Sequence, residues 1–236
     1  MAKGIIINTG GTGVPPKLVI STFDASKRAS YVPGKELDCT SQLKLDVGYL
    51  VEGTVANDGT GNLVFTVVNV LDSTPTIITG NTSGNVSIGA DQSYLVQSTG
   101  QITGNVSVNG GVLFVNGGKA SGSVSIADNS TIICTTGSNV GGGTFDVSGT
   151  GSNASVAFKG VTVKGKFSTS GIAFVDLGGN NFNGNVSSDK DQYVTIKGNT
   201  IGGTNKNLTV SNVVNECNIS GNTVSGTTTI DPKCQL

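Results

Sequence analysis

The feature that most constrains the fold of this chain is a short unit that recurs about every 20 residues after Thr79. The unit reads Gly-x-Φ-x-Φ, where Φ is an apolar residue, and Lys206 replaces the glycine once. Its copies start 18 to 22 residues apart, at 84–88, 104–108, 122–126, 143–147, 165–169, 184–188, 206–210 and 226–230. A single unit cannot bury its own apolar side chains, whereas a stack of units can. The repeat therefore predicts a solenoid.

Each unit is followed by two further apolar segments. The second segment is a run such as Val112–Val115 or Ile172–Val175, and the third is short and centred on residues such as Ile102 and Val140. Three short strands per turn, with side chains alternating inward and outward, describe a triangular coil whose neighbours stack about 4.8 Å apart. We therefore expect an all-β chain whose residues 79–236 form a parallel β-solenoid of about eight coils. Val86, Val106 and Val124 should then share one interior column.

Glycine and asparagine recur where the coils should turn. Glycine permits a positive φ at such corners, and stacked asparagines can hydrogen-bond along the stack. The asparagines fall into two expected groups, Asn85, Asn105 and Asn185 at one corner and Asn181, Asn199 and Asn222 at another. The segments 196–201 and 219–224 are the most typical, and through them the chain resembles the right-handed parallel β-helices of the pectate-lyase-like family. That resemblance implies a right-handed coil.

Residues 1–75 have a different character from the repeat region. They hold four of the five prolines and the only arginine, Arg28. Five strands are expected, and 57–61 is a strong hairpin turn between the last two. The expected strands are Gly4–Asn8, Lys17–Phe23, Glu36–Leu45, Tyr49–Ala56 and Leu63–Leu71. Five short strands in this length predict a small β-barrel or sandwich.

The stretch 45–55, with Asn69 and Val70 beyond it, resembles the later half of cold-shock and other OB-fold domains. Cold-shock domains stack bases on aromatic side chains, but the matching strand here, Lys17–Ile20, is aliphatic. Without stacking platforms, binding of single-stranded nucleic acid is not expected. The resemblance therefore implies a barrel shape without a nucleic-acid function.

Charge and cysteine content exclude several classes of protein. The net charge is −1 with 12% charged residues, so there is no basic stripe for duplex DNA or anionic lipid. No run of 18 apolar residues predicts a membrane span. The chain has no histidine and no C-x-x-C spacing, which argues against zinc. Cys39 and Cys134 are expected as small buried side chains, and Cys217 and Cys234 lie in the last coil, close enough in sequence to bridge.

The acidic residues of the repeat region do not form a recognisable catalytic pattern. The resembled enzymes act on acidic or capsular polysaccharides with Asp and His, or with Ca²⁺-binding Asp and a catalytic Arg or Lys. We expect Asp146 to point outward and Asp176 to follow a second-segment run, so the two are not expected to meet. Asp189 and Asp191 are expected in a solvated turn, with a Ca²⁺ site as the sharper alternative. The sequence thus predicts no enzyme, and no catalytic, cofactor-binding or metal-binding residue.

Other candidate sites also have simple structural interpretations. Lys164 and Lys166 are interpreted as solubilising charges on an exposed edge, and residues 10–16 as a flexible loop, since they lack the lysine and helix of a phosphate loop. A glycan site would need exposed aromatics. Phe145, Phe167 and Phe174 are expected inward, and Tyr94 and Tyr193 are the candidates for exposure. An ice-binding ladder of outward threonines (Thr144, Thr209, Thr227 and Thr229) is interrupted by Ser87, Ser107, Ser125 and Asp146.

Low charge and regular β-structure suit an extracellular protein, but the apolar run in 1–8 is too short for a signal peptide. Virion components reconcile the two observations, because they are made in the host cytoplasm and released by lysis. We therefore expect a virion protein that serves as a non-enzymatic structural or attachment component, such as a phage spike, fibre or decoration.

The order of the two regions also resembles phage spikes, in which an OB-like domain precedes a β-helix. The expected partners are other virion proteins and identical chains in a trimer, with a host surface glycan as a further candidate. The N-terminal domain should cap one end of the rod and the segment from Cys217 to Leu236 the other. The alternatives are a polysaccharide-binding or polysaccharide-degrading β-helix protein, or a cell-surface adhesin located outside the cell.

Overall fold

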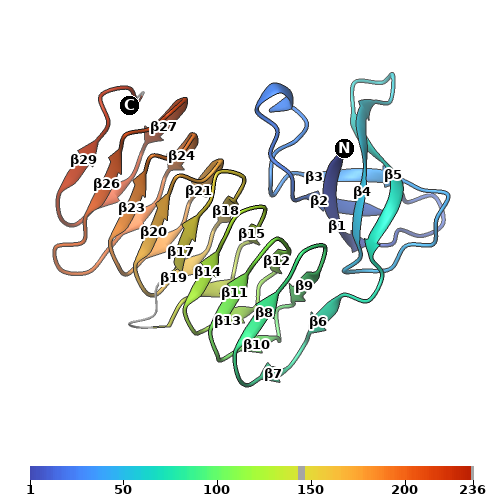
Figure 1. Ribbon diagram of the computed structural model, residues 1–236, viewed down its shortest axis with the longest axis horizontal. Coiled ribbons are helices and arrows are strands. Elements are labelled where there is room, and N and C mark those ends of the chain that lie inside the picture. The colour runs from blue at the N-terminus through green and yellow to red at the C-terminus, as the bar shows by residue number, and fades with distance from the viewer. Residues whose placement is uncertain (143–146, 235–236) are drawn as a thin grey trace.

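The computed structural model describes residues 1–142 and 147–234, and it shows a small closed barrel beside a long three-sided stack of strands (Figure 1). In the barrel, the strand order is β1-β2-β3-β5-β4, closed by pairing of β4 with β1. Its elements are β1 (Ala2–Asn8), β2 (Lys17–Ile20), the 3₁₀ turn η1 (Ala25–Lys27), β3 (Glu36–Thr40), β4 (Leu50–Asn57) and β5 (Leu63–Asp72). The five predicted strands are all present, although β2 and β3 end at Ile20 and Thr40, before the predicted Phe23 and Leu45. β4 and β5 form the expected hairpin.

Neighbouring strands of the barrel are antiparallel, except that β3 and β5 are parallel. Its core contains Ile6, Leu18, Val51 and Phe65, each fully buried. Gly53 of β4 faces this core, and a Cβ there would lie 2.0 Å from the carbonyl oxygen of Thr66. Only glycine fits at that close approach of two backbones.

The second part of the chain is a parallel β-solenoid of eight coils, as predicted. Its first strand, β6, begins four residues after the end of β5. Its strands form three parallel sheets, which we call C, D and E. Sheet C contains β6 (Thr76–Ile78), β9 (Ser93–Val96), β12 (Val112–Val115), β15 (Thr131–Cys134), β18 (Ser155–Lys159), β21 (Phe174–Gly178), β24 (Tyr193–Lys197) and β27 (Glu216–Ser220).

Two further sheets complete the triangle. Sheet D contains β7 (Asn81–Thr82), β10 (Gln101–Ile102), β13 (Lys119–Ala120), β16 (Asn139–Val140), β19 (Thr162–Val163), β22 (Asn181–Phe182), β25 (Thr200–Ile201) and β28 (Thr223–Val224). Sheet E contains β8 (Val86–Ile88), β11 (Val106–Val108), β14 (Val124–Ile126), β17 (Val147–Thr150), β20 (Phe167–Ser170), β23 (Val186–Asp189), β26 (Leu208–Ser211) and β29 (Thr228–Ile230).

The register of sheet E confirms the predicted interior column. Val106 pairs with Val86 on one side and with Val124 on the other. One unit was misaligned: Val147 pairs with Val124, so the fourth strand begins two residues after the predicted 145. A slip of two residues preserves the alternation of inward and outward positions, so the sequence pattern could not exclude it. Phe145, Asp146 and Thr144 lie outside the described residues.

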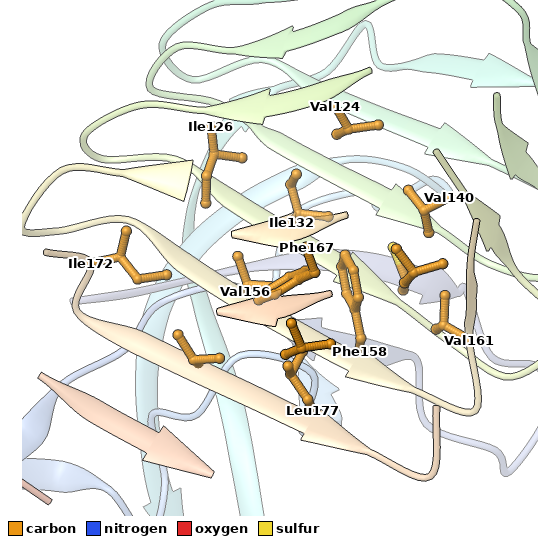
Figure 2. Close-up of a cluster of buried hydrophobic side chains, with 14 of the residues drawn as sticks. Val124, Ile126, Ile132, Val140, Val156, Phe158, Val161, Phe167, Ile172 and Leu177 are labelled. Carbon is orange, nitrogen blue, oxygen red and sulfur yellow. The ribbon is translucent and has the colours of Figure 1, made fainter. Parts of the chain in front are cut away.

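The described interior of the solenoid is mainly apolar, with a buried polar group at Thr169, Ser188 and Asp191. Phe167 packs edge-to-face against Phe158 and Phe182, with 5.8 Å between ring centroids in each pair. Figure 2 shows Phe158 and Phe167 among aliphatic side chains from neighbouring coils, including Val156 and Leu177. Edge-to-face packing of this kind adds to the burial of apolar area, so the middle coils are firmly packed.

The asparagine ladders form, with one correction. In the first, the Oδ1 of Asn85 accepts from the backbone N–H of Asn105 at 3.0 Å. In the second, the stacked residue is Asn180 and not the predicted Asn181, which is an exposed residue of β22. The backbone N–H of Asn180 donates to Asn199 and that of Asn199 donates to Asn222. The corner begins one residue earlier than predicted, so the neighbouring asparagine faces inward.

Corner glycines with a positive φ occur as predicted, among them Gly84, which leads the first repeat, but three other leading glycines serve a different purpose. Gly104, Gly122 and Gly184 do not have a positive φ. A Cβ on these residues would instead lie 2.0 to 2.4 Å from the carbonyl oxygen of the stacked glycine in the preceding coil. Close stacking of the backbones therefore excludes a side chain, and positive φ is used at another corner, as at Gly179 and Gly198.

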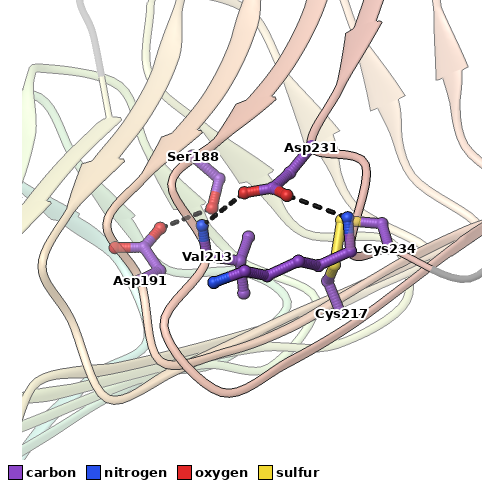
Figure 3. Close-up of a disulfide and its surroundings, with 7 residues drawn as sticks. Ser188, Asp191, Val213, Cys217, Asp231 and Cys234 are labelled. Carbon is purple, nitrogen blue, oxygen red and sulfur yellow. Dashed lines mark hydrogen bonds between the residues drawn. A yellow bond between two sulfur atoms is a disulfide. The ribbon is translucent and has the colours of Figure 1, made fainter.

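The barrel does not cap the end of the solenoid, which corrects the prediction. It lies along the flank, against the outer face of sheet C (Figure 1). At the other end the tail folds back, and Cys234 is bonded to Cys217 and packs on the solenoid core (Figure 3). The end predicted to be closed by the C-terminal segment is therefore covered in part by a disulfide-bonded tail.

Candidate functional site at the barrel–solenoid junction

An apolar interface, which we call the seat, joins the barrel to the flank of the solenoid. Ile5, Val19 and Leu50 of the barrel pack against a group of sheet C side chains. Those side chains are Leu95, Val112, Phe114 and Ile133, all buried. Because sheet C is thereby buried on both faces, its strands β12 and β15 are buried at every position.

Hydrogen bonds fix the position of the barrel on this seat. Thr131 Oγ1 donates to the backbone oxygen of Ser21 at 2.7 Å. Ser93 Oγ donates to the backbone oxygen of Gly48 at 2.9 Å, and the backbone N–H of Ser93 donates to Asp72 at 2.9 Å. Buried polar contacts of this kind are directional, so they select one orientation of the barrel.

The segment between β2 and β3 extends the contact to the last coils. Phe23 stacks on Phe174 at 4.7 Å between centroids and lies 5.1 Å from Tyr193. Arg28 lies over the ring of Tyr193 and is paired with Glu216. Phe174, Tyr193 and Glu216 belong to three successive coils, so one loop bridges the end of the rod that the barrel itself does not reach.

A hollow of about 250 Å³ remains between the barrel and the solenoid. We call it the junction hollow. Its apolar wall includes Phe23, Leu50 and Val112. Its polar lining comes from both parts of the chain, namely Lys3, Ser21, Thr22, Asn129, Thr131, Asn153 and Ser155, with Gly110 completing the wall.

Two hydroxyl groups of the junction hollow have no protein partner. Ser21 is 4% exposed, and its Oγ is the one buried side-chain nitrogen or oxygen in the described ranges that lacks a hydrogen-bond partner. Ser155 is 2% exposed, and its hydroxyl makes no hydrogen bond to any described residue. Buried polar groups are nearly always hydrogen-bonded, so the buried Oγ of Ser21 is an exception to that rule beside the hollow.

The charge at the junction hollow is balanced. Lys3 Nζ lies 2.6 Å from the carboxylate of Asp91. The remaining polar groups are hydroxyls and amides, which donate and accept. The hollow is therefore lined by neutral groups that can both donate and accept hydrogen bonds, beside an apolar wall.

The acidic turn predicted from the sequence is not one site. Asp191 is fully buried and accepts from Thr169 Oγ1 at 2.6 Å, from Ser188 Oγ at 2.5 Å and from the backbone N–H of Ile172 at 2.9 Å. Burial raises the pKa of Asp191 in spite of these hydrogen bonds. Asp189 instead accepts from Ser211 and Asn212, and these bonds lower its pKa.

The prediction of a solvated turn is thus wrong for Asp191, and the two carboxylates are engaged with different protein donors. No group of three potential metal ligands occurs among the described residues.

Asp176 occupies an outward position on sheet C. It lies in β21 and not after it, paired in register with Ala157 and Thr195. Its carboxylate is 3.9 Å from Lys159 Nζ, and desolvation raises its pKa although Lys159 and Lys197 oppose the shift.

The aromatic residues were predicted only in part. Phe167 is inward and fully buried, as expected. Phe174 is buried but faces outward, under Phe23, which the inward prediction missed. Tyr94 packs against the solenoid core, and Tyr193 lies beneath the barrel loop. The missed signal was the presence of bulky apolar residues at outward positions of β12, β15 and β21.

Two other surface predictions can be compared with the structure. Lys164 and Lys166 are exposed, as predicted. The outward ladder of sheet E is not interrupted by Asp146, because Ser148 occupies that register. The ladder consists of Ser87, Ser107, Ser125, Ser148, Ser168, Ser187, Thr209 and Thr229.

Two of the four cysteines are free and two form a disulfide, a pairing that the sequence left open. Cys39 and Cys134 are free and buried, and burial raises the pKa of both thiols, that of Cys39 to about 11. Cys217 and Cys234 are bonded to each other (Figure 3). The carboxylate of Asp231 accepts from the backbone N–H groups of Val213 and Lys233, and its backbone oxygen accepts from the N–H of Cys234, so Asp231 fixes the same tail.

Within the described residues, no helix has the length and apolar character needed to cross a membrane. The chain matches no protein-family model, no curated protein and no solved structure with which it was compared. The function must therefore be argued from the geometry of the junction and of the solenoid.

Proposed function

We propose that this chain is a non-enzymatic structural and attachment component of a virus particle, such as a phage spike, fibre or decoration. The observation that carries the proposal is the seating of the barrel along the flank of an eight-coil solenoid, by apolar packing at one end and by the Phe23–Arg28 loop at the other. Such a seat joins barrel and rod into one stiff body, which suits a part that must project from or decorate a particle.

The chemistry of the solenoid also supports a structural role. The buried Asp191 is committed to three protein donors, and Asp176 lies beside Lys159 on the sheet surface. Hydrolysis of a glycoside by two carboxylates needs both to face one substrate. We further propose that the coil is right-handed and pectate-lyase-like and that the barrel is OB-like. The proposed partners are other virion proteins and identical chains in a trimer.

The location of the chain provides the test. Particles purified from a lysate of the producing host should contain the chain by mass spectrometry, and gold-labelled antibody should decorate them in electron micrographs. Labelling of intact, uninfected cells instead would favour a cell-surface adhesin and refute the virion assignment. Analytical ultracentrifugation of the purified chain tests the trimer separately.

A second candidate is favoured by one specific observation. The junction hollow is lined by serine, threonine and asparagine residues beside Phe23, a combination that suits binding of a polyhydroxylated ligand. Binding of this kind is compatible with an attachment role.

A further inference from the structure

We infer that the C-terminal end of the solenoid is a self-association surface, which binds the first coil of a second copy of this chain once the disulfide-bonded tail is released. The inference goes beyond the proposed function, because it concerns the ends of the rod and does not depend on a particle. It begins from the edges of the three sheets. Among the described residues, β27, β28 and β29 each pair with one neighbouring strand only, and so do β6, β7 and β8 at the other end. Free strand edges of this kind are templates for further pairing.

The interior of the last coil is also incompletely covered. A hollow of about 250 Å³ at this end is lined by residues of β27, β28 and β29 and by Leu208 of the preceding coil. Its other apolar side chains are Ile219, Val224 and Ile230, of which the last two are only partly buried. Because each coil of a solenoid is covered by the next one, the last coil leaves apolar area that one more layer would bury.

The first coil of a second copy has the inward residues that fit this end. In the register of the sheets, Ile78 heads the column that ends at Ile219. Ile88 likewise heads the column that ends at Ile230. Two copies stacked end to end would continue both columns with apolar contacts. A single strand or a helix could pair with only one of the three free edges, so the occupant is a coil of the same kind.

The backbone of sheet E indicates which hydrogen bonds would join the two copies. The N–H of Leu208 donates to the backbone oxygen of Thr227 in the following coil at 3.1 Å, and earlier coils repeat this pattern. Thr228 follows Leu208 in the same column, so its N–H is directed to the open end. In a second copy, the backbone oxygen of Asn85 occupies the position that would accept this hydrogen bond in a parallel ladder.

The disulfide-bonded tail obstructs the contact. Thr76 heads the inward column that ends at Cys217. Thr76 of a second copy would therefore lie where Cys234 is bonded to Cys217 (Figure 3). The tail is also tied to the solenoid by the hydrogen bond from the N–H of Val213 to Asp231, at 2.9 Å. While the disulfide is formed, one corner of the end is closed to a second copy.

Reduction is the step that opens this corner. A dithiol reductant supplies two electrons and two protons, which break the S–S bond and leave thiols on Cys217 and Cys234, while the reductant is oxidised to its own disulfide. The tail is then held by noncovalent contacts alone and can be displaced by the incoming coil. The tail thus acts as a redox-sensitive cover that prevents edge-to-edge assembly of the rod.

Sedimentation velocity of the full chain over a range of concentrations, with and without dithiothreitol, tests the inference. Reduction should raise the weight-average mass about twofold or more over that of the oxidised protein, and the mass should rise further with concentration, because a head-to-tail contact does not close. The double variant Cys217→Ala, Cys234→Ala should assemble in the same way without reductant. In electron micrographs the assemblies should be rods that lengthen in steps of about 38 Å, from eight coils about 4.8 Å apart.

Two lysine variants, made in the double-alanine background, provide a matched pair. Thr228 and Thr229 are neighbouring exposed residues of β29. Thr228 belongs to an inward column and lines the end hollow, so Thr228→Lys places a charge across the open end and should abolish assembly. Thr229 belongs to the outward ladder of sheet E, so Thr229→Lys should leave assembly intact. Circular dichroism of each variant confirms that it is folded.

The inference is wrong if neither the reduced protein nor the double variant gains mass, or if Thr228→Lys assembles as readily as Thr229→Lys. Equal assembly of the oxidised protein would refute the role of the tail as a cover. Disordered aggregates in place of rods would refute the end-to-end contact. A mass of three chains that is the same in both redox states would support the trimer of the proposed function and refute this inference.

Discussion

The coils beneath the barrel and the coils beyond it differ in how the same sheet is stabilised. In one outward column of sheet C, Leu95, Phe114 and Ile133 are buried under the barrel, whereas Asp176, Thr195 and Asn218 follow further along. The covered coils are apolar on both faces. The later coils have an apolar interior, supplemented by the asparagine ladder, the buried Asp191 and the disulfide.

This difference shows what a continuous apolar run means in a solenoid. Inward residues alternate in every coil because the core demands it. Outward positions become apolar only where something covers them. The strands β12 and β24 make the contrast clear, since the first is buried at each position and the second alternates.

The largest expected effect tests the covered coils. Phe114→Ala should lower the free energy of unfolding by about 3–5 kcal/mol, because it removes a fully buried ring from the seat. Thr195→Ala, in the same column but beyond the barrel, should change it by less than about 0.5 kcal/mol. Urea titrations of both variants make the comparison. Equal losses would mean that the barrel does not cover the column as described.

The disulfide tests the end of the uncovered coils. Reduction of the Cys217–Cys234 bond, which spans 17 residues, should cost about 3 kcal/mol. The reason is that the tail regains freedom in the unfolded state. Thermal melts with and without reductant measure the loss. The double variant Cys217→Ala, Cys234→Ala serves as the control and should not respond to reductant. A response equal to that of wild type would assign the effect to another part of the protein.

The asparagine ladder offers a smaller and more local test. Asn199→Ala should cost about 1–3 kcal/mol, because it leaves buried backbone groups of the neighbouring coils without partners. Asn181→Ala changes an exposed asparagine of the same kind and should be near neutral. Chemical denaturation compares the two. If Asn181 proved the more sensitive residue, the corner would begin where the sequence pattern alone had suggested.

The pH dependence of Asp191 is the smallest expected effect. Because burial raises the pKa of Asp191 in the folded protein, the folded state binds a proton more tightly than the unfolded state. Stability from this group is therefore present below the ordinary carboxyl pKa and is lost as pH rises through the raised value.

The difference in unfolding free energy between wild type and Asp191→Asn should accordingly fall as pH rises above about 4. Urea titrations at several pH values measure the difference. Asp189→Asn is a suitable comparison, because the pKa of Asp189 is lowered and its contribution should change in the opposite direction. A difference that increases with pH for Asp191 would contradict the assigned burial.

The repeat by itself determined the solenoid, its coil number and most of its register. Val86, Val106 and Val124 could be placed in one column because like residues recur at a nearly constant interval and stack on one another. The barrel strands could likewise be predicted from the local alternation of apolar and polar residues and from the turn at 57–61. Both features depend on residues that are close in sequence or repeat within it.

Tertiary structure alone decided where the barrel sits and what lies between it and the rod. Ser21 and Ser155 are far apart in the chain, and both line the junction hollow only because the barrel and the solenoid bury apolar surfaces against each other. No local pattern encodes such a fit, although the apolar outward residue Phe114 was evidence that something must cover sheet C. Docking of this kind depends on the summed shape and polarity of distant segments, and those are defined only once both parts have folded.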